Sequence, residues 1–373
     1  MRIGIVGAGM AGASLAWQLA GKRRVLLIER ESQPGYHSTG RSAATLHRAY
    51  GNAVIRALTA ASAPFYTAPP AGFSEVALAS PRGTMVVADA DGLAALDAEI
   101  EAARPLVPDI RRLDAGQCVA LVPGLRREAI VAGMHDPGLL DLDVGAILAG
   151  FLQGARARGV LVRTDAELVA AEPVGEGWRL GLRGGALLTC GTLVNAAGAW
   201  ADSVAALAGL APLGIVPLRR TAILVQVPAG LGLERWPMVH AADESWYVKP
   251  DAGRLLCSPV DEAPCPPGDV QPEELDVAIC VDRIERAFTF PIRRVESRWA
   301  GLRCFAPDRS PVLGRDPQAP RFVWLAGQGG YGIQTAPALA ALAAALVLDE
   351  PPPAALAGID LAALAPGRPQ VPA

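Results

Sequence analysis

The sequence lacks the patterns typical of metal-binding, membrane-spanning and exported proteins. Its 6 cysteines and 4 histidines are scattered, without the C-x-x-C spacing of a zinc site. We therefore expect no metal site, reduced thiols and a cytoplasmic location. The longest apolar run, residues 336–348, is too short and too rich in alanine to cross a bilayer, so we expect no transmembrane segment. A dinucleotide-binding pattern begins at residue 2, so we expect no signal peptide.

Strong charge and internal repeats are also missing. The 34 basic and 37 acidic side chains give a net charge of −3, and Lys and Arg form no long run, so we expect no nucleic-acid partner. The chain has 373 residues, more than one hydrophobic core usually serves, which predicts two domains. Its apolar fraction of 51% and charged fraction of 19% are typical of a well-buried α/β protein.

Residues 2–30 carry a complete dinucleotide-binding pattern: an apolar run, a glycine-rich turn, a helical stretch and a second apolar run that ends at Glu29. Gly7 permits the tight turn, Gly9 lets the backbone approach a pyrophosphate, and Gly12 lets the helix pack closely. The start of the helix would hold the phosphates. Glu29, about 20 residues on, is placed to accept hydrogen bonds from a ribose. An ordinary glycine-rich turn is the alternative, but strand, helix and acid all lie where a dinucleotide needs them.

The rest of the chain does not continue as a nicotinamide-dependent enzyme would. Residues 33–44 are small and rich in hydroxyl groups, which suits backbone that lies against a ligand. Residues 217–292 alternate strands with proline-rich turns, which predicts an inserted antiparallel sheet. The other predicted elements are helices at 54–68, 92–104, 143–158 and 333–348, strands at 85–87, 160–163, 192–195 and 322–326, and a hairpin at 167–183.

Several blocks of the sequence resemble the D-amino-acid oxidase superfamily of FAD-dependent oxidoreductases, and within it the bacterial D-arginine dehydrogenases. These blocks are residues 33–44 (QPGYHSTGRSAA), 194–200, 243–253, 299–303 (WAGLR) and 328–335 (QGGYGIQT). The resemblance implies an α/β plus α+β fold, in which a Rossmann-like FAD-binding domain carries an inserted, mainly antiparallel-sheet substrate domain. The implied bounds are 1–76, 140–214 and 312–365 for the FAD-binding domain, 77–139 and 215–311 for the substrate-binding domain, and 366–373 for a frayed tail.

The resemblance also implies which residues contact FAD. Cys304 follows Arg303, but its spacing matches poorly with relatives that attach flavin through cysteine, so we expect non-covalent FAD. The implied cofactor-binding residues are Gly7, Gly9, Met10, Ala11, Gly12, Glu29, Arg30, His37, Ser38, Thr39, Arg41, Ser42, Ala43, Ala44, Leu168, Ala197, Gly198, Trp200, Gly301, Arg303, Gly329, Gly330, Tyr331, Gly332, Ile333, Gln334 and Thr335.

The resemblance places a substrate carboxylate between two arginines. Arg220 and Arg303 match the family's carboxylate-binding arginines, and a planar guanidinium binds carboxylate in a bidentate way. Tyr50 and Tyr247 match tyrosines that line the family's pocket, and the carbonyl of Gly330 is placed to accept from the substrate amine. The implied reaction is oxidation of a D-amino acid by hydride transfer from Cα, which gives an imino acid that hydrolyses to a 2-oxo acid and ammonia.

Two positions depart from the D-arginine enzymes. Thr84 stands where they carry a glutamate, and Thr45 stands where they carry a histidine, with His47 two positions later. A buried cation without a partner is costly, so we expect a neutral or apolar D-amino acid as the better substrate. Three alternatives remain: a secondary amine such as sarcosine, a 2-hydroxy acid, or a flavin-binding subunit without activity. Besides its substrate, we expect the protein to react with an electron acceptor, which is oxygen, a quinone or another compound.

Overall fold

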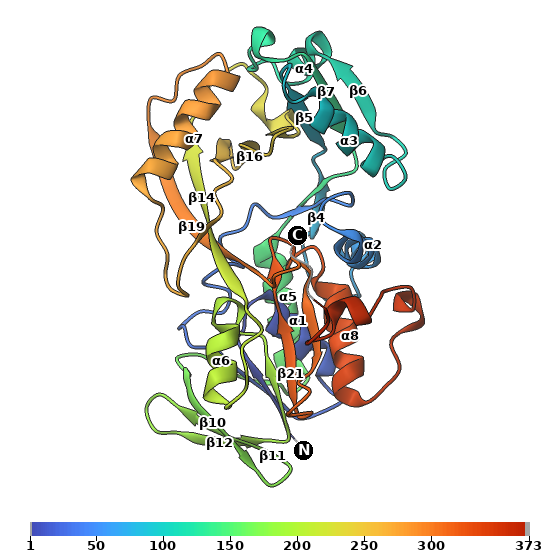
Figure 1. Ribbon diagram of the computed structural model, residues 1–373, viewed down its shortest axis with the longest axis vertical. Helices are drawn as coiled ribbons and strands as arrows, with labels where there is room; N and C mark the ends of the chain where they lie inside the picture. Colours follow the sequence, from blue (N-terminus) through green and yellow to red (C-terminus); the bar gives the residue numbers. More distant parts are fainter. Residues whose placement is uncertain (1, 370–373) are drawn as a thin grey trace.

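A six-stranded, mostly parallel sheet forms the lower half of the molecule in Figure 1. The computed structural model describes residues 2–369. The strand order is β20-β21-β13-β1-β2-β9, and β20 alone runs antiparallel to its neighbour. The strands are β1 (Ile3–Val6), β2 (Val25–Ile28), β9 (Leu161–Arg163), β13 (Thr192–Asn195), β20 (Val312–Arg315) and β21 (Phe322–Ala326).

This sheet is covered on both faces, as parallel sheets require. Ile5 and Leu27 pack against the helices of one face, whereas Val6 and Ile28 point to the other face, where a three-stranded meander lies. Ile5 and Leu27 are fully buried, and each such side chain contributes about 1.5–3 kcal/mol to folding. The covering elements are helices α1 (Met10–Leu19), α2 (Ala53–Thr67), α5 (Val144–Ala157) and α8 (Ala336–Leu348) on one side, and α6 (Ala201–Leu207) with β10 (Leu168–Val174), β11 (Gly177–Leu182) and β12 (Leu187–Cys190) on the other.

A second, larger sheet forms the upper half of the molecule (Figure 1). Its order is β22-β19-β14-β17-β16-β15-β5-β7-β6, with β18 beside β14, and only β15 and β5 pair in parallel. The strands are β5 (Thr84–Ala88), β6 (Arg111–Asp114), β7 (Ala132–Asp136), β14 (Val216–Val225), β15 (Met238–Ala241), β16 (Tyr247–Asp251), β17 (Arg254–Ser258), β18 (Ala263–Pro264), β19 (Val295–Phe305) and β22 (Gln328–Gly329). Helices α3 (Leu93–Ala103), α4 (Ala115–Leu121) and α7 (Glu274–Ala287) accompany it.

The long strands β14 and β19 join the two halves, because they run from the upper part of the molecule toward the lower sheet (Figure 1). They pair over most of their length, with Arg220 opposite Gly301 and Leu218 opposite Arg303. At its lower end β19 also pairs with β22, which opposes Cys304 to Gly329. A small sheet of β3 (Thr45–Leu46), β8 (Leu140–Leu142) and β4 (Ala79–Pro81) lies beside these elements. The domain bounds themselves stay a prediction.

The structure differs from the sequence-based expectation in three segments. Within residues 217–292, where we predicted strands and turns, helix α7 forms and buries Val277, Cys280 and Ile284, which are spaced as one helical face. Helix α8 begins at Ala336 and not at 333. In the segment predicted to be frayed, Arg368 binds the carboxylate of Asp308 and is packed; residues 370–373 lie outside the described part of the chain.

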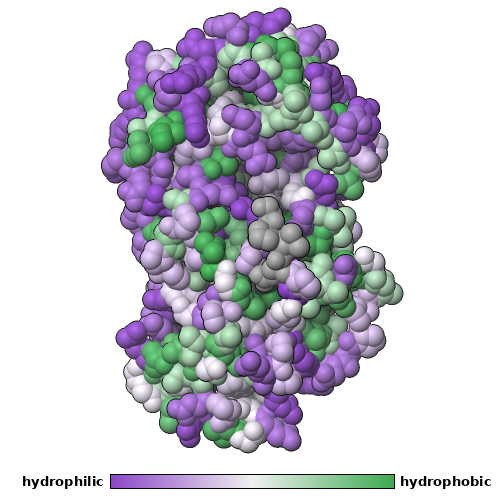
Figure 2. Space-filling model, viewed as in Figure 1, coloured by the Kyte–Doolittle hydropathy of each residue, from purple (hydrophilic) through white to green (hydrophobic). Residues whose placement is uncertain are grey.

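The outer surface is mixed in character. On the face drawn in Figure 2, hydrophobic residues lie in separate patches between hydrophilic ones. Among residues 2–369, no helix is both long enough and apolar enough to cross a bilayer.

Candidate active site

Three adjoining cavities run from the ends of the parallel strands to the inner face of the large sheet. The first, the strand-end cavity, lies where β1, β2 and β13 end and includes Gly7 and Glu29. The second, the middle cavity, shares Ser38 and Thr39 with the first. The third, the arginine cavity, shares Arg220, Tyr247, Arg303 and Gly330 with the second. Together they form one elongated site.

The glycine-rich turn forms one wall of the strand-end cavity. Gly7 has a φ of +98°, and a Cβ there would meet the Ala196 carbonyl oxygen at 2.5 Å, so only glycine fits. A Cβ on Gly12 would overlap the carbonyl oxygen of Gly7, so this glycine permits close packing of α1 on the turn. Gly9 precedes α1 and provides no side-chain cap, while Ala11 lines the middle cavity. The N–H of Met10 donates to the Thr39 hydroxyl at 3.0 Å, and the other backbone N–H groups at the N-terminus of α1 are placed as in a phosphate-binding helix.

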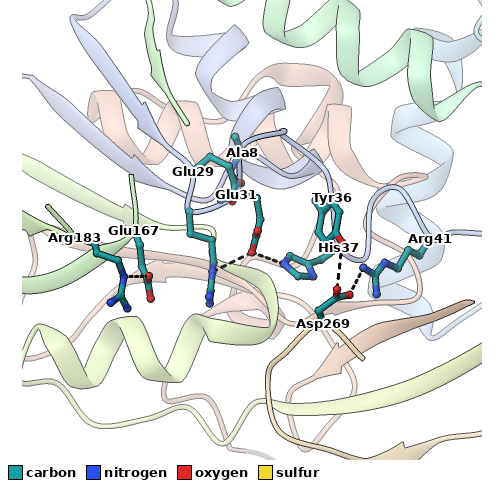
Figure 3. Close-up of polar contacts among 10 residues, drawn as sticks. Ala8, Glu29, Glu31, Tyr36, His37, Arg41, Glu167, Arg183 and Asp269 are labelled. Carbon is teal, nitrogen blue, oxygen red and sulfur yellow. Dashed lines mark hydrogen bonds and ion pairs between the residues drawn. The ribbon is translucent and has the colours of Figure 1, made fainter. Parts of the chain in front are cut away.

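Glu29 is buried at the floor of the strand-end cavity. Its Oε2 accepts from the N–H of Ala8 at 2.8 Å, and its Oε1 accepts from the N–H of Glu31 at 3.0 Å (Figure 3). Each carboxylate oxygen keeps a further lone pair for a ribose hydroxyl. Glu31 in turn binds His37 at 2.9 Å and Arg30 at 3.1 Å.

Trp200 supplies the aromatic wall of this cavity. Arg30 lies over its ring at 4.7 Å and the His37 ring lies 4.6 Å from it, centroid to centroid. Leu168, Ala197 and Gly198 complete the lining, as the sequence-based assignment expects. A flat, partly apolar wall beside a buried carboxylate suits an adenosine.

Residues 33–44 are fastened to the large sheet. The Ser38 hydroxyl donates to the Leu302 carbonyl at 2.6 Å, and Arg41 donates to the Ala300 carbonyl at 2.9 Å. The Arg41 guanidinium also pairs with Asp269 at 2.5 Å, and Asp269 accepts from the Tyr36 hydroxyl at 3.2 Å (Figure 3). The charge of Arg41 is therefore already paired within the protein, although its side chain lines the middle cavity.

All seven substrate-site residues named from the sequence line the arginine cavity. They are His47, Tyr50, Thr84, Arg220, Tyr247, Arg303 and Gly330. Thr84 is fully buried, and its hydroxyl donates to the Met238 carbonyl at 3.2 Å. Arg219, the neighbour of Arg220 in β14, does not line this cavity; it binds Glu273 at 2.8 Å and Asp276 at 3.0 Å.

The two cavity arginines differ in their partners. Arg220 donates to the Asp261 carbonyl at 2.8 Å and to Glu262 at 2.9 Å. Burial and the neighbouring Arg303 cation lower the pKa of Arg220. Burial raises the pKa of Glu262, but Arg309, Arg220 and Arg303 outweigh this and hold it below the ordinary value. Within residues 2–369, no carboxylate lies at ion-pair distance from Arg303. Arg303 therefore offers its charge to whatever occupies the cavity.

Sequence reasoning missed several ionisable residues of this cavity. Glu99, His240 and Glu244 line it, and the His240 Nε2 lies 4.0 Å from a Glu99 oxygen. Burial lowers the pKa of His240, although Glu99 acts to raise it. Asp136 lies behind His47 at 3.5 Å. Glu244 lies in the resemblance block 243–253, where the sequence analysis gave it no role. No local motif marks Glu99, His240 or Asp136, because they come from α3, β15 and β7 and meet only in the folded chain.

A few assigned cofactor residues lie outside the three linings. Gly12, Tyr331 and Thr335 line none of them, while every other assigned cofactor residue lines at least one. Thr335 donates to the Tyr331 carbonyl at 2.8 Å, and Tyr331 packs against Tyr50. Thr335 and Tyr331 therefore lie behind residues that line the cavities.

Cys304 lines the middle cavity, but burial raises the pKa of its thiol to about 12, so the reactive thiolate is disfavoured.

Comparisons with known proteins agree with this arrangement. A bovine FAD-dependent oxidoreductase domain-containing protein 1 is 24% identical, over 92% of this chain and 80% of the relative. The crystal structure of glycine oxidase from Geobacillus kaustophilus matches with a TM-score of 0.86 at 23% identity, covering 98% of this chain and 99% of that one. Iminodiacetate oxidase from Chelativorans sp. BNC1 matches with a TM-score of 0.82 at 24% identity, covering 98% and 99%.

The strand-end and middle cavities combine features that suit FAD: a glycine turn, a helix start and a buried carboxylate with free lone pairs. The family model of FAD dependent oxidoreductases, named DAO, matches residues 2–346. The chain therefore belongs to the DAO family of FAD-dependent oxidoreductases.

Proposed function

We propose that the protein oxidises a D-amino acid to an imino acid, which water hydrolyses to a 2-oxo acid and ammonia. One observation carries the proposal: the Arg303 guanidinium lines the arginine cavity without a carboxylate partner from residues 2–369. Leaving a cation unpaired in a covered cavity is costly, and a substrate carboxylate relieves that cost.

The cofactor would be held along the first two cavities. Ala11 and Gly9 at the start of α1 would bind the pyrophosphate, Glu29 the ribose, and Ser42 with Ala43 the region nearest the arginine cavity. FAD, when bound, supplies the ring that accepts a hydride from the substrate.

The residues of the arginine cavity would bind and orient the substrate. Arg303 and Arg220 would take the carboxylate, with hydroxyl donors from Tyr50 and Tyr247. The Gly330 carbonyl would accept from the amine. Holding both the carboxylate and the amine of the substrate would set the direction of its Cα–H bond and keep water from the reacting atoms.

An N-substituted glycine is the second candidate substrate. Iminodiacetate oxidase, a protein of the same fold, bears in its name a substrate that combines a secondary amine with carboxylates. The arginine pair suits any carboxylate, so it favours neither candidate over the other.

Anaerobic bleaching of the purified yellow holoenzyme tests the proposal. The panel contains D-amino acids, their L-enantiomers, glycine, sarcosine, iminodiacetate and 2-hydroxyglutarate. We expect D-amino acids to bleach the flavin fastest. Faster bleaching by sarcosine or iminodiacetate would favour the second candidate, faster bleaching by 2-hydroxyglutarate would indicate a hydroxy-acid enzyme, and no bleaching by any compound would indicate a flavin-binding protein without this activity. Admitting air afterwards shows whether oxygen reoxidises the flavin.

A further inference from the structure

A buried carboxylate stands behind the histidine of the arginine cavity. Asp136, the last residue of β7, has a relative exposure of 1%. Its Oδ1 accepts from the N–H of Gly138 at 2.6 Å, and its Oδ2 lies 3.5 Å from Nε2 of His47. Burial raises the pKa of Asp136, but the contact with His47 and the Gly138 N–H outweigh burial and hold it below the ordinary value. Asp136 is therefore an ionised carboxylate directed at one imidazole.

His47 is held in place on several sides. Its backbone N–H donates to Oε1 of Gln334 at 3.2 Å, and its ring is stacked with Tyr50 at 6.0 Å and 13°. Its Nε2 is buried and makes no hydrogen bond of ordinary geometry within residues 2–369, so Asp136 is the group it faces. The residue lines the arginine cavity, and Nδ1 makes no hydrogen bond to any described residue. The ring thus has one nitrogen toward Asp136 and the other free for a ligand.

The carboxylate decides which nitrogen carries the proton. A neutral imidazole has one N–H and one lone pair, and an anionic partner places the N–H on its own side. With the proton on Nε2, facing Asp136, Nδ1 keeps the lone pair and is a proton acceptor. The other ionisable groups around this pair are His135, His240, Glu99, Tyr50 and Arg303.

We propose that the Asp136–His47 pair accepts the proton that a substrate ammonium loses before oxidation. This rests on the proposed function, because an amino acid enters as an ammonium and only the neutral amine can form a C=N bond. In this step one N–H bond of the ammonium breaks, its electron pair stays on nitrogen, and the proton bonds to Nδ1 of His47. Asp136 stays ionised, stabilises the imidazolium and acts as a positioning residue. No electrons are exchanged in the step, and the proton later passes to solvent.

The test compares the pH dependence of anaerobic flavin reduction in holoenzyme variants. In the wild type, the rate should fall on acidification, because only a neutral imidazole can accept a proton. His47→Gln should lower the rate by about 100-fold at neutral pH and displace the acid limb to higher pH, since the amine must then arrive already neutral. Asp136→Asn should lower the rate of flavin reduction less than His47→Gln does, and it should also displace the acid limb of the pH profile to higher pH. His135→Gln, which alters the neighbouring histidine outside the cavity lining, is the matched control and should keep the wild-type profile.

Measuring the binding of a 2-oxo acid distinguishes a variant that has lost the proton acceptor from one whose fold is damaged. A 2-oxo acid has the carboxylate but no ammonium, so its dissociation constant, read from the flavin absorbance shift, should change less than about twofold in His47→Gln. Unchanged pH profiles in both variants would overturn the proposal, as would parallel losses of 2-oxo acid binding and flavin reduction. Absence of bleaching in the wild type would instead overturn the proposed function.

Discussion

In the proposed function, Arg303 is the residue on which substrate binding would depend most. Arg303→Lys keeps the charge but loses the planar fork, and we expect kcat/KM for the preferred amino acid to fall about 10- to 100-fold, mostly through KM. Steady-state kinetics check this. Arg219→Lys on the neighbouring strand is the control, because Arg219 binds Glu273 and Asp276 outside the cavity. Equal effects of the two substitutions would contradict the assigned clamp.

Glu99 bears on the side-chain preference. The family resemblance places Thr84 where the D-arginine enzymes carry a glutamate. Glu99 and Glu244 nevertheless provide carboxylates that line the arginine cavity. The expectation of a neutral side chain stays a prediction, and these carboxylates provide a way to test it. Glu99→Gln should lower kcat/KM for D-arginine about fivefold, because an ion pair with a side chain that is 32% exposed is partly screened by water, and should leave D-methionine nearly unchanged. Equal losses for both substrates would show that Glu99 does not contact the side chain.

Asp136 links the site to stability at low pH. Its folded-state pKa lies below the ordinary value, so its ionised form stabilises the fold above the unfolded-state pKa. This contribution is lost as pH falls through the lower, folded-state pKa. The difference in Tm between wild type and Asp136→Asn should be constant from about pH 6 to 8 and shrink below about pH 4. Thermal melts across this range measure it, and a difference that grows on acidification would contradict the assignment.

At the scale of elements, residues 33–44 form a strap, a segment that lines both the strand-end and the middle cavity, where we propose that FAD binds. Arg41 fastens this strap to the Ala300 and Val270 carbonyls and to Asp269. Asp269→Asn should raise the FAD dissociation constant only about two- to fivefold, because the Asp269 side chain is 49% exposed. Arg41→Ala should raise it further, since both carbonyl contacts are lost too. Recovery of flavin fluorescence on dilution measures FAD release. FAD release from Arg41→Ala at the wild-type level would contradict a role of residues 33–44 in holding FAD.

The elements also show where sequence reasoning succeeds. The residues of the motif from Gly7 to Glu29 are close together in the sequence. The positions of its turn, its helix and its acidic residue could therefore be predicted. Arg220 and Arg303 are far apart in the chain, and only the family resemblance brought them together, before the pairing of β14 with β19 explained it. Asp136 and Glu99 could not be predicted, because nothing near them in the sequence indicates that their elements reach the cavity. Helix α7 was missed because neighbouring prolines suggested turns.

At the scale of the whole molecule, the arrangement separates cofactor from substrate recognition. The parallel sheet ends at the strand-end cavity, while the large sheet supplies Arg220 from β14 and Arg303 from β19 to the arginine cavity. The two long strands place both arginines where these cavities adjoin. A substrate in the arginine cavity is therefore next to any cofactor in the middle cavity.

The buried thiol in the middle cavity predicts how FAD is retained. Burial raises the pKa of Cys304 to about 12, which disfavours the thiolate that covalent attachment would need. Acid precipitation of the holoenzyme should release the yellow colour into the supernatant. Colour that stays with the precipitated protein would contradict non-covalent binding.

The most direct test of the account is anaerobic flavin reduction by the two enantiomers of one amino acid, measured in the same holoenzyme preparation. The account predicts fast bleaching by D-methionine, slow or no bleaching by L-methionine, and loss of the D-methionine reaction at low concentration in Arg303→Lys. Bleaching by the L-enantiomer alone, or wild-type reduction in Arg303→Lys, would contradict it.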